Sequence, residues 1–202
     1  MINTIIFDLG AVLIDWNPEY LYKSHFANEA EMKHFLTNVA TSDWNEEQDA
    51  GRSLQEGTEL LLAKHPEHEE PIRMFYSRWE EMLGGPFHDT VAIFRKLKQS
   101  GKFKIYALTN WSAETFVRAK ELYDFLGWFD GIVVSGEEKM RKPTPAFYHI
   151  LLNRYHINPT EALFIDDNLR NVKAARELGI PSIHFTSAEA LEKELPNYSI
   201  TL

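Results

Sequence analysis

Short apolar runs alternate with amphipathic segments over most of this chain. The first run, residues 4–7, ends at Asp8, and four more predict strands at residues 104–108, 131–134, 162–165 and 182–185. Between and after them, apolar residues recur at three- and four-residue spacing, which predicts helices at 90–100, 113–126, 145–155, 169–178 and 189–194. Because strands that alternate with helices form parallel sheets, the pattern predicts an α/β fold with a doubly wound parallel sheet.

A different pattern lies between the first and second of these strands. From residue 19 to about residue 82 the apolar positions keep helical spacing without a β-run, which predicts a compact helical bundle. Breaks between its helices are expected at Gly51, Gly57 and His65-Pro66, and a hinge and turn at Gly84-Gly85-Pro86. We therefore expect a core of residues 1–15 and 86–202, with a helical cap of residues 16–85 inserted after the first strand.

Composition narrows the possible functions. A chain of 202 residues with 44% hydrophobic residues can bury one sizeable core, or a core and a small cap. The net charge of −9 argues against general binding to nucleic acid or anionic membranes, so an anionic substrate needs a local positive site. Without cysteine, disulfides, thiolate nucleophiles and zinc–thiolate sites are excluded. The first apolar run is too short for a signal peptide or membrane span, so we expect a cytoplasmic protein.

Candidate chemistry lies at the ends of the predicted strands. In an open α/β sheet, ligands bind beyond the carboxyl ends of the strands, which places Asp8 at the mouth of a site. Gly10 is expected to let the backbone turn sharply there and approach a ligand closely. Taken alone, this segment is equally compatible with a strand end that carries a solvated aspartate.

Two further strand ends carry polar groups. Thr109 and Asn110 precede a predicted helix, with Ser112 as its expected N-cap. The Thr109 hydroxyl, the Asn110 amide and the free N–H groups at the start of the helix together suit a bound phosphate. Simple helix capping is the alternative.

Asp166 and Asp167 follow the strand at 162–165, and adjacent carboxylates repel each other unless a cation or proton lies between them. A Mg²⁺ site built from few carboxylates and substrate oxygens fits this pair.

A basic loop lies between these two motifs. Pro143 and Pro145 stiffen it, and this would fix the direction of Lys142, whose ammonium group suits anionic oxygens. Without the other motifs, such a loop would be interpreted as a solvated surface. Each motif follows its own strand of one sheet, so together they predict a single site.

Four segments resemble the motifs of the haloacid dehalogenase (HAD) superfamily, in the same order and with similar spacing. They are Phe7-Asp8-Leu9-Gly10-Ala11-Val12-Leu13, Leu108-Thr109-Asn110, Arg141-Lys142-Pro143 and Phe164-Ile165-Asp166-Asp167-Asn168. The resemblance covers roughly residues 1–15 and 86–185. It implies a Rossmann-like core, and the helical insert lies where this superfamily places a helical cap.

The resemblance also implies a reaction. Asp8 would attack phosphorus to form an aspartyl-phosphate that water hydrolyses, so the protein would be a phosphatase of small phosphate monoesters. Thr109 and Asn110 would hold the phosphoryl group, and Lys142 would balance the charge of Asp8 and the phosphate. Mg²⁺ would be held by Asp8, the Gly10 carbonyl and Asp167, with Asp166 binding directly or through water. We expect a monomer or homodimer.

One position departs from most phosphatases of the superfamily. They carry a second aspartate, the general acid and base, two residues after the nucleophile, whereas this chain has Gly10. In this respect it is most similar to bacterial phosphatases of sugar phosphates such as glucose 1-phosphate, which also show Asp-Leu-Gly and whose ester has a good leaving group. Asp15, His25, Asp49 and water are the candidates for the missing acid.

Two other functions fit parts of the pattern. A 2-haloacid dehalogenase uses the same aspartate on carbon without metal, but the Asp166-Asp167 pair favours a metal and a phosphate. A non-catalytic binding or regulatory protein with this fold is the second alternative.

The cap is expected to select the substrate. Trp16 and Trp44 are candidates to stack on a sugar, and Arg52 is a candidate to reach an anionic substrate. Alternatively, both tryptophans pack inside the bundle and Arg52 lies on the surface.

Overall fold

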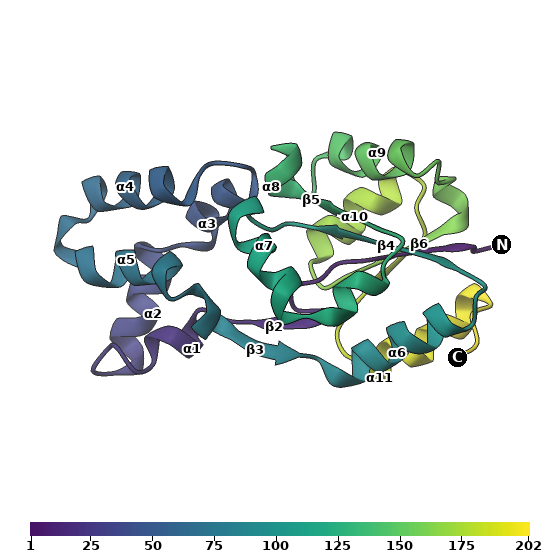
Figure 1. Ribbon diagram of the computed structural model, residues 1–202, viewed down its shortest axis with the longest axis horizontal. Helices are drawn as coiled ribbons and strands as arrows, with labels where there is room; N and C mark the ends of the chain where they lie inside the picture. The colour runs from purple at the N-terminus through teal and green to yellow at the C-terminus, as the bar shows by residue number, and fades with distance from the viewer.

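The computed structural model describes residues 1–202, and a five-stranded parallel sheet lies at its centre (Figure 1). The strand order is β5-β4-β1-β6-β7. The bounds are Thr4–Phe7 for β1, Lys104–Thr109 for β4, Gly131–Val134 for β5, Ala162–Asp166 for β6 and Ser182–His184 for β7. All five predicted strands are therefore present, with ends shifted by at most one residue.

Strand β1 occupies the centre of the sheet and sets the position of Asp8. Phe7 is in register with Ala107 of β4 and with Ile165 of β6. The Asp8 N–H continues this pairing and donates to the Ile165 carbonyl at 2.8 Å. The carboxyl ends of β1, β4 and β6, with the motifs that follow them, consequently meet at one edge of the sheet.

Helices cover both faces of the sheet, because side chains alternate between its faces along each strand. On one face, Ile5 and Phe7 pack in a cluster of 38 buried residues that includes positions on α6 (His88–Gln99), α7 (Ala113–Leu122) and α11 (Ala188–Glu194). On the other face, Ile6 packs with α9 (Pro145–Arg154) and α10 (Leu169–Glu177). The shorter elements are α8 (Ser135–Glu138) and the 3₁₀ turns η3 (Asp124–Trp128), η4 (Pro159–Glu161) and η5 (Leu195–Tyr198). The doubly wound arrangement is confirmed.

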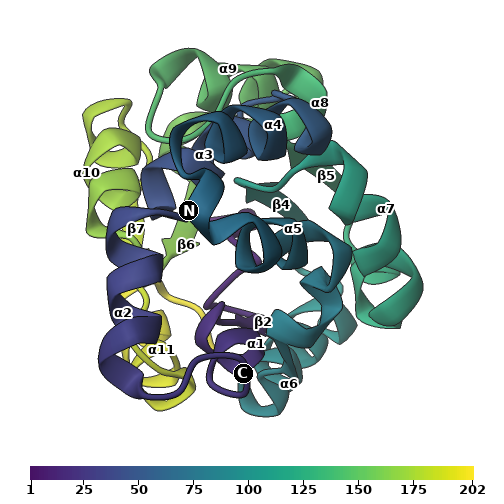
Figure 2. The same ribbon diagram turned by 90° about the vertical axis from the view of Figure 1, so that its left-hand side faces the viewer.

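The residues between β2 and β3, which we call the helical insert, lie beyond the carboxyl edge of the sheet. Figure 2 shows helices α2 to α5 in front of the strands. The insert contains α1 (Glu19–Tyr22), α2 (Glu29–Asn38), α3 (Ser42–Asp49), α4 (Leu54–Lys64), η1 (Pro66–His68), α5 (Glu69–Ser77) and η2 (Trp79–Met82). Aromatic contacts join these elements, such as Tyr22 against Phe35 with ring centroids 5.0 Å apart. No helix in the chain combines the length and apolar character needed to cross a membrane.

Two local predictions were wrong because tertiary contacts outweigh local signals. Gly57 does not end a helix but lies within α4, where an added Cβ would be 2.6 Å from the Gln48 side chain, so glycine allows α3 and α4 to pack closely. The helix at 113–126 ends at Leu122, and η3 follows it. The expected N-cap is present, since the Ser112 hydroxyl accepts a hydrogen bond from the Glu114 N–H.

A small antiparallel pair of strands, β2 (Ile14–Trp16) and β3 (Leu83–Pro86), replaces the expected hinge and turn. It crosses both expected boundaries between core and cap. Gly84 makes room for the Asp15 carboxylate, because a Cβ on Gly84 would lie 2.2 Å from Asp15 Oδ2. Two glycines and a proline have low strand propensity, so only the pairing itself reveals β3.

We expect Gly84→Ala to lower the free energy of unfolding by about 1–3 kcal/mol, because the new methyl group overlaps the Asp15 carboxylate. Urea unfolding measures the change. Gly127→Ala is the matched control, since a Cβ there meets no atom within 4 Å. Adding Asp15→Ala to Gly84→Ala should restore part of the loss, and a Gly84→Ala protein as stable as the control would contradict this explanation.

Candidate active site

A fully buried lysine ammonium lies at the centre of the motifs. Lys142 Nζ is 2.9 Å from Asp8 Oδ1 and 2.7 Å from Asp166 Oδ2, and the side chain has no exposed surface. Burial alone would lower the pKa of Lys142, but the charges of Asp166 and Asp8 outweigh it and raise the pKa. The lysine therefore remains an ammonium ion, and it keeps both aspartates close.

The backbone of Lys142 is held by Asn110. Asn110 Nδ2 donates to the Lys142 carbonyl at 3.0 Å, and the Lys142 N–H donates to Asn110 Oδ1 at 2.8 Å. Pro145 then occupies the first turn of α9. Asn110 also lines the pocket, so its expected contact with a phosphoryl group stays a prediction beside this positioning of the lysine.

The two adjacent aspartates after β6 have different surroundings. Asp166 is fully buried; it accepts from Lys142 through Oδ2, from the Asn168 N–H through Oδ1 at 2.8 Å, and from Asn171 Nδ2 through both oxygens at 3.1 Å. Asp167 instead lines a pocket together with Asp8 and Gly10. The structure thus gives Asp166 an anchoring position beside Lys142 and leaves Asp167 facing the space where ligands bind.

Three carboxylates converge here against one ammonium. One oxygen from each of Asp8, Asp166 and Asp167 lies within 4.8 Å of the others. Burial raises the pKa of Asp8, an effect that Asp166 and Asp167 reinforce and that the ammonium of Lys142 opposes. Burial and the charge of Asp166 also raise the pKa of Asp167. An all-oxygen donor set with excess negative charge fits a hard divalent cation such as Mg²⁺.

Thr109 supplies a second indication of a ligand. Its hydroxyl is buried at the end of β4 and has no hydrogen-bond partner. Leaving such a group unsatisfied is unfavourable, so a water molecule or a bound ligand is expected to supply a partner.

Gly10 lines the pocket but is not the residue that makes the left-handed turn after Asp8. The left-handed conformation in this turn belongs to Ala11, with φ of 56°, and not to Gly10. A Cβ on Gly10 would meet no atom within 4 Å. The left-handed conformation of the turn therefore does not depend on Gly10, and open space lies where most phosphatases of the superfamily carry their acid.

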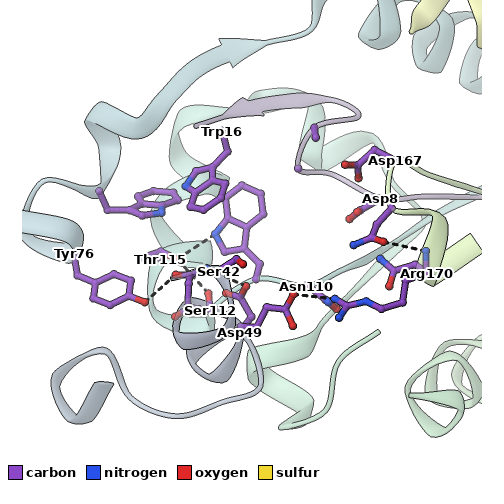
Figure 3. A pocket seen from close by; sticks show the side chains of 18 residues that line it. Asp8, Trp16, Ser42, Asp49, Tyr76, Asn110, Ser112, Thr115, Asp167 and Arg170 are labelled. Atoms are coloured by element: carbon purple, nitrogen blue, oxygen red, sulfur yellow. Dashed lines mark hydrogen bonds and ion pairs between the residues drawn. The ribbon is translucent and has the colours of Figure 1, made fainter. Parts of the chain in front are cut away.

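The pocket beside Asp8 has a volume of about 250 Å³ and lies between the core and the helical insert (Figure 3). Of the candidates in the insert and the adjoining β2, Trp16 and Asp49 line it. Burial raises the pKa of Asp49 to about 7, reinforced by Glu46 and opposed by the Ser112 N–H and Arg141. Asp49 therefore keeps its proton to a higher pH than an ordinary aspartate does.

The other four candidates lie outside the pocket. Asp15 accepts a hydrogen bond from the Tyr20 hydroxyl at 2.8 Å, and His25 packs edge-on against Phe26. Trp44 packs inside the insert and donates to the Gly57 carbonyl at 2.9 Å. Arg52 donates to Gln48 and to the Trp44 carbonyl. Their contacts are structural.

Sequence reasoning missed the residues that join the insert to the core at the rim of the pocket. Glu46 of α3 forms ion pairs with Arg141 and with Arg170 of α10, and Figure 3 shows Arg170 among the residues that line the pocket. Arg170 closely follows Asp166-Asp167 in the sequence, and this position next to a predicted site motif could have identified it as a residue near the site. Nothing local distinguishes Glu46 from the other acidic residues of its helix.

The motifs, their geometry and the fold together define a class of enzyme. The family model of the haloacid dehalogenase-like hydrolases matches residues 2–179, so the chain belongs to this family. It is a HAD-like hydrolase.

Its relatives include named phosphatases. The chain is 29% identical over 199 residues to the sesquiterpene phosphatase astK of Aspergillus oryzae, covering 94% of this chain and 93% of that protein. It is 24% identical over 187 residues to the phosphorylated carbohydrates phosphatase of Thermotoga maritima, covering 90% and 84%. The structure of a HAD family enzyme from Bacteroides thetaiotaomicron, in complex with magnesium and inorganic phosphate, has the same fold, with a TM-score of 0.68, 23% identity and coverage of 92% and 95%.

We expect Glu46→Gln to lower the free energy of unfolding by about 1–2 kcal/mol, because it removes the charge from two half-buried ion pairs between insert and core. Glu47→Gln is the matched control on the same helix, since Glu47 is more exposed and lies 3.6 Å from Arg141. Urea unfolding of both variants measures the difference. Equal stability of the two would show that the Glu46 pairs do not hold the insert in place.

Proposed function

We propose that this protein is a Mg²⁺-dependent phosphatase of small phosphate monoesters that acts through an aspartyl-phosphate on Asp8. The observation that supports this most strongly is the buried contact of Lys142 with Asp8, beside a pocket that Asp167 and Gly10 also line. A fixed ammonium next to a carboxylate nucleophile reduces the repulsion between that carboxylate and a phosphate dianion.

The two carboxylate oxygens of Asp8 differ in their hydrogen bonds. Oδ1 accepts from Lys142 and, at 2.7 Å, from the Leu9 N–H, whereas Oδ2 makes no hydrogen bond within the protein. The aspartate would attack phosphorus in line, and the bond from phosphorus to the ester oxygen would break as the new bond forms. The Thr109 hydroxyl would donate to a phosphoryl oxygen, and water would then hydrolyse the acyl-phosphate.

Asp8 and Asp167, with the Gly10 carbonyl, would hold Mg²⁺, and the bound ion would supply positive charge to the phosphate oxygens. Asp166, whose oxygens already accept from Lys142, Asn168 and Asn171, would act by anchoring the lysine.

Phosphate transfer explains the site better than the alternatives. A metal-independent dehalogenase gives no reason for three converging carboxylates, and a non-catalytic protein gives none for a carboxylate held against a buried ammonium at the edge of the pocket. The two named relatives share a phosphate and differ in the group that carries it. A sugar phosphate thus stays a prediction, as do a cytoplasmic location and the absence of nucleic-acid and membrane partners.

We expect Asp8→Asn to reduce the hydrolysis of acetyl phosphate by at least ~10³-fold, because the amide is not a nucleophile. EDTA should abolish the activity of the unaltered protein, and added Mg²⁺ should restore it. Phosphate release measures both effects. An unaltered protein that is inactive with Mg²⁺ would support a binding function, and halo-acid turnover that survives EDTA would support a dehalogenase.

We further propose that Asp49 protonates the leaving group in place of the aspartate that Gly10 lacks. Asp49 lines the same pocket as Asp8 and comes from the insert that covers it. Its pKa of about 7 keeps a protonated fraction at neutral pH. Because the acid acts in its protonated form, turnover of esters with poor leaving groups should fall as the pH rises through 7.

We expect Asp49→Asn to slow the hydrolysis of benzyl phosphate by about 10²-fold, because an alkoxide needs a proton as it leaves. p-Nitrophenyl phosphate should be affected far less, since nitrophenolate leaves without one. Adding Gly10→Asp, for which the structure has space, should restore benzyl phosphate turnover. Steady-state kinetics of both esters test this, and an equal loss with both would show that Asp49 acts only structurally.

A further inference from the structure

Away from Asp8, the pocket becomes a chamber walled by aromatic rings. We call the space bounded by Trp16, Tyr76, Trp79 and Trp111 the aromatic chamber. The rings come from β2, α5, η2 and the residues after β4, and Trp79 meets Trp111 with ring centroids 5.9 Å apart. Figure 3 shows Trp16 and Tyr76 at one end of the pocket, with Asp8 and Asp167 at the other. A phosphoryl group at Asp8 would therefore point the rest of its ester toward these rings.

The polar groups around the chamber are mostly bonded to one another. The Tyr76 hydroxyl donates to Asn45 Oδ1 at 2.9 Å and accepts from Gln48 Nε2 at 2.7 Å, while Asn45 Nδ2 donates to Asp49 at 3.3 Å.

On the opposite wall, Trp111 Nε1 donates to Thr115 Oγ1 at 3.1 Å, and Ser112 Oγ accepts from the Glu114 N–H. On the aromatic walls themselves, only the indole N–H groups of Trp16 and Trp79 have no partner within the protein, so these walls offer few hydrogen bonds to the hydroxyl groups of a sugar.

Charge further restricts the group that enters. Glu46 and Asp49 line the pocket, and the lining cation Arg170 is already paired with Glu46. A second phosphate or a carboxylate on the leaving group would therefore meet like charge without a free cation. The volume of 250 Å³ covers the whole pocket, including the end beside Asp8 that the phosphoryl group would occupy, so the space left for the leaving group suits a single ring or a short branched chain.

We infer that the substrate is a monophosphate ester of an uncharged apolar alcohol, aromatic or isoprenoid, that buries its hydrocarbon part in the aromatic chamber. This inference rests on the proposed phosphatase function and differs from the sugar phosphate that the sequence resemblance implies. The transfer of a hydrocarbon group from water to a site lined by aromatic rings is favourable. Such a leaving group also needs no hydrogen bonds from the rings.

Three primary alkyl phosphates provide the test, because their leaving groups need similar help from an acid. With Mg²⁺, kcat/KM should be at least about tenfold higher for benzyl phosphate and dimethylallyl phosphate than for glucose 6-phosphate. Acetyl phosphate is the reference, since its leaving group is too small to fill the chamber. Its hydrolysis reports the phosphatase function independently of the chamber.

A pair of variants links the preference to the chamber. Trp16→Leu should reduce the ratio of kcat/KM for benzyl phosphate to that for acetyl phosphate by about tenfold, because it removes one aromatic wall. Trp44→Phe, which alters a tryptophan outside the pocket, should leave this ratio unchanged. If neither variant folds, the panel of esters on the unaltered protein still decides.

The outcomes separate the two proposals. Hydrolysis of acetyl phosphate with glucose 6-phosphate preferred over both apolar esters would overturn the inference and leave the phosphatase function standing. The same holds if Trp16→Leu and Trp44→Phe have equal effects on the ratio. No hydrolysis of any ester with Mg²⁺ would overturn the proposed function, and the inference with it.

Discussion

The site depends on one buried ammonium ion. Lys142 can lie in the interior only because Asp8 and Asp166 offset the loss of its hydration, and each aspartate in turn can be ionised there because of the lysine. Asn110 holds the lysine backbone, and Asn168 and Asn171 hold Asp166. Removing any one partner would leave a buried charge unpaired. The four motifs are therefore best understood as parts of one charge network, in which Asp167 is the member left open to a ligand.

The fold creates this network through strand register, and the insert completes the pocket beside it. Parallel pairing of β1 with β4 and β6 brings three strand ends, distant in sequence, to one edge of the sheet. The helical insert then closes over that edge through Glu46 and through the pairing of β2 with β3. The core thus supplies the groups for phosphate chemistry, while the insert supplies Asp49 and two aromatic residues, Tyr76 and Trp79, to the pocket.

Much of the core could be predicted from sequence, because apolar runs mark buried strands and the polar residues after each run mark the catalytic edge. The family assignment followed from those same motifs and is confirmed. Local patterns could not show that Asn110 binds a lysine backbone 32 positions away, or that Gly84 accommodates Asp15 in a strand. The aromatic chamber was also hidden, since Trp16, Tyr76 and Trp111 come from separate elements and resemble ordinary core residues in sequence.

A crystal structure of the protein with Mg²⁺ tests the central claim most directly, since it requires no assumption about the substrate. Three carboxylates against one ammonium should draw a divalent ion into the pocket. The account predicts an ion that binds both Asp8 and Asp167, with Lys142 still in contact with Asp8 and Asp166. An ion bound elsewhere at millimolar Mg²⁺, or carboxylates of Asp8 and Asp167 too far apart to share one, would contradict it.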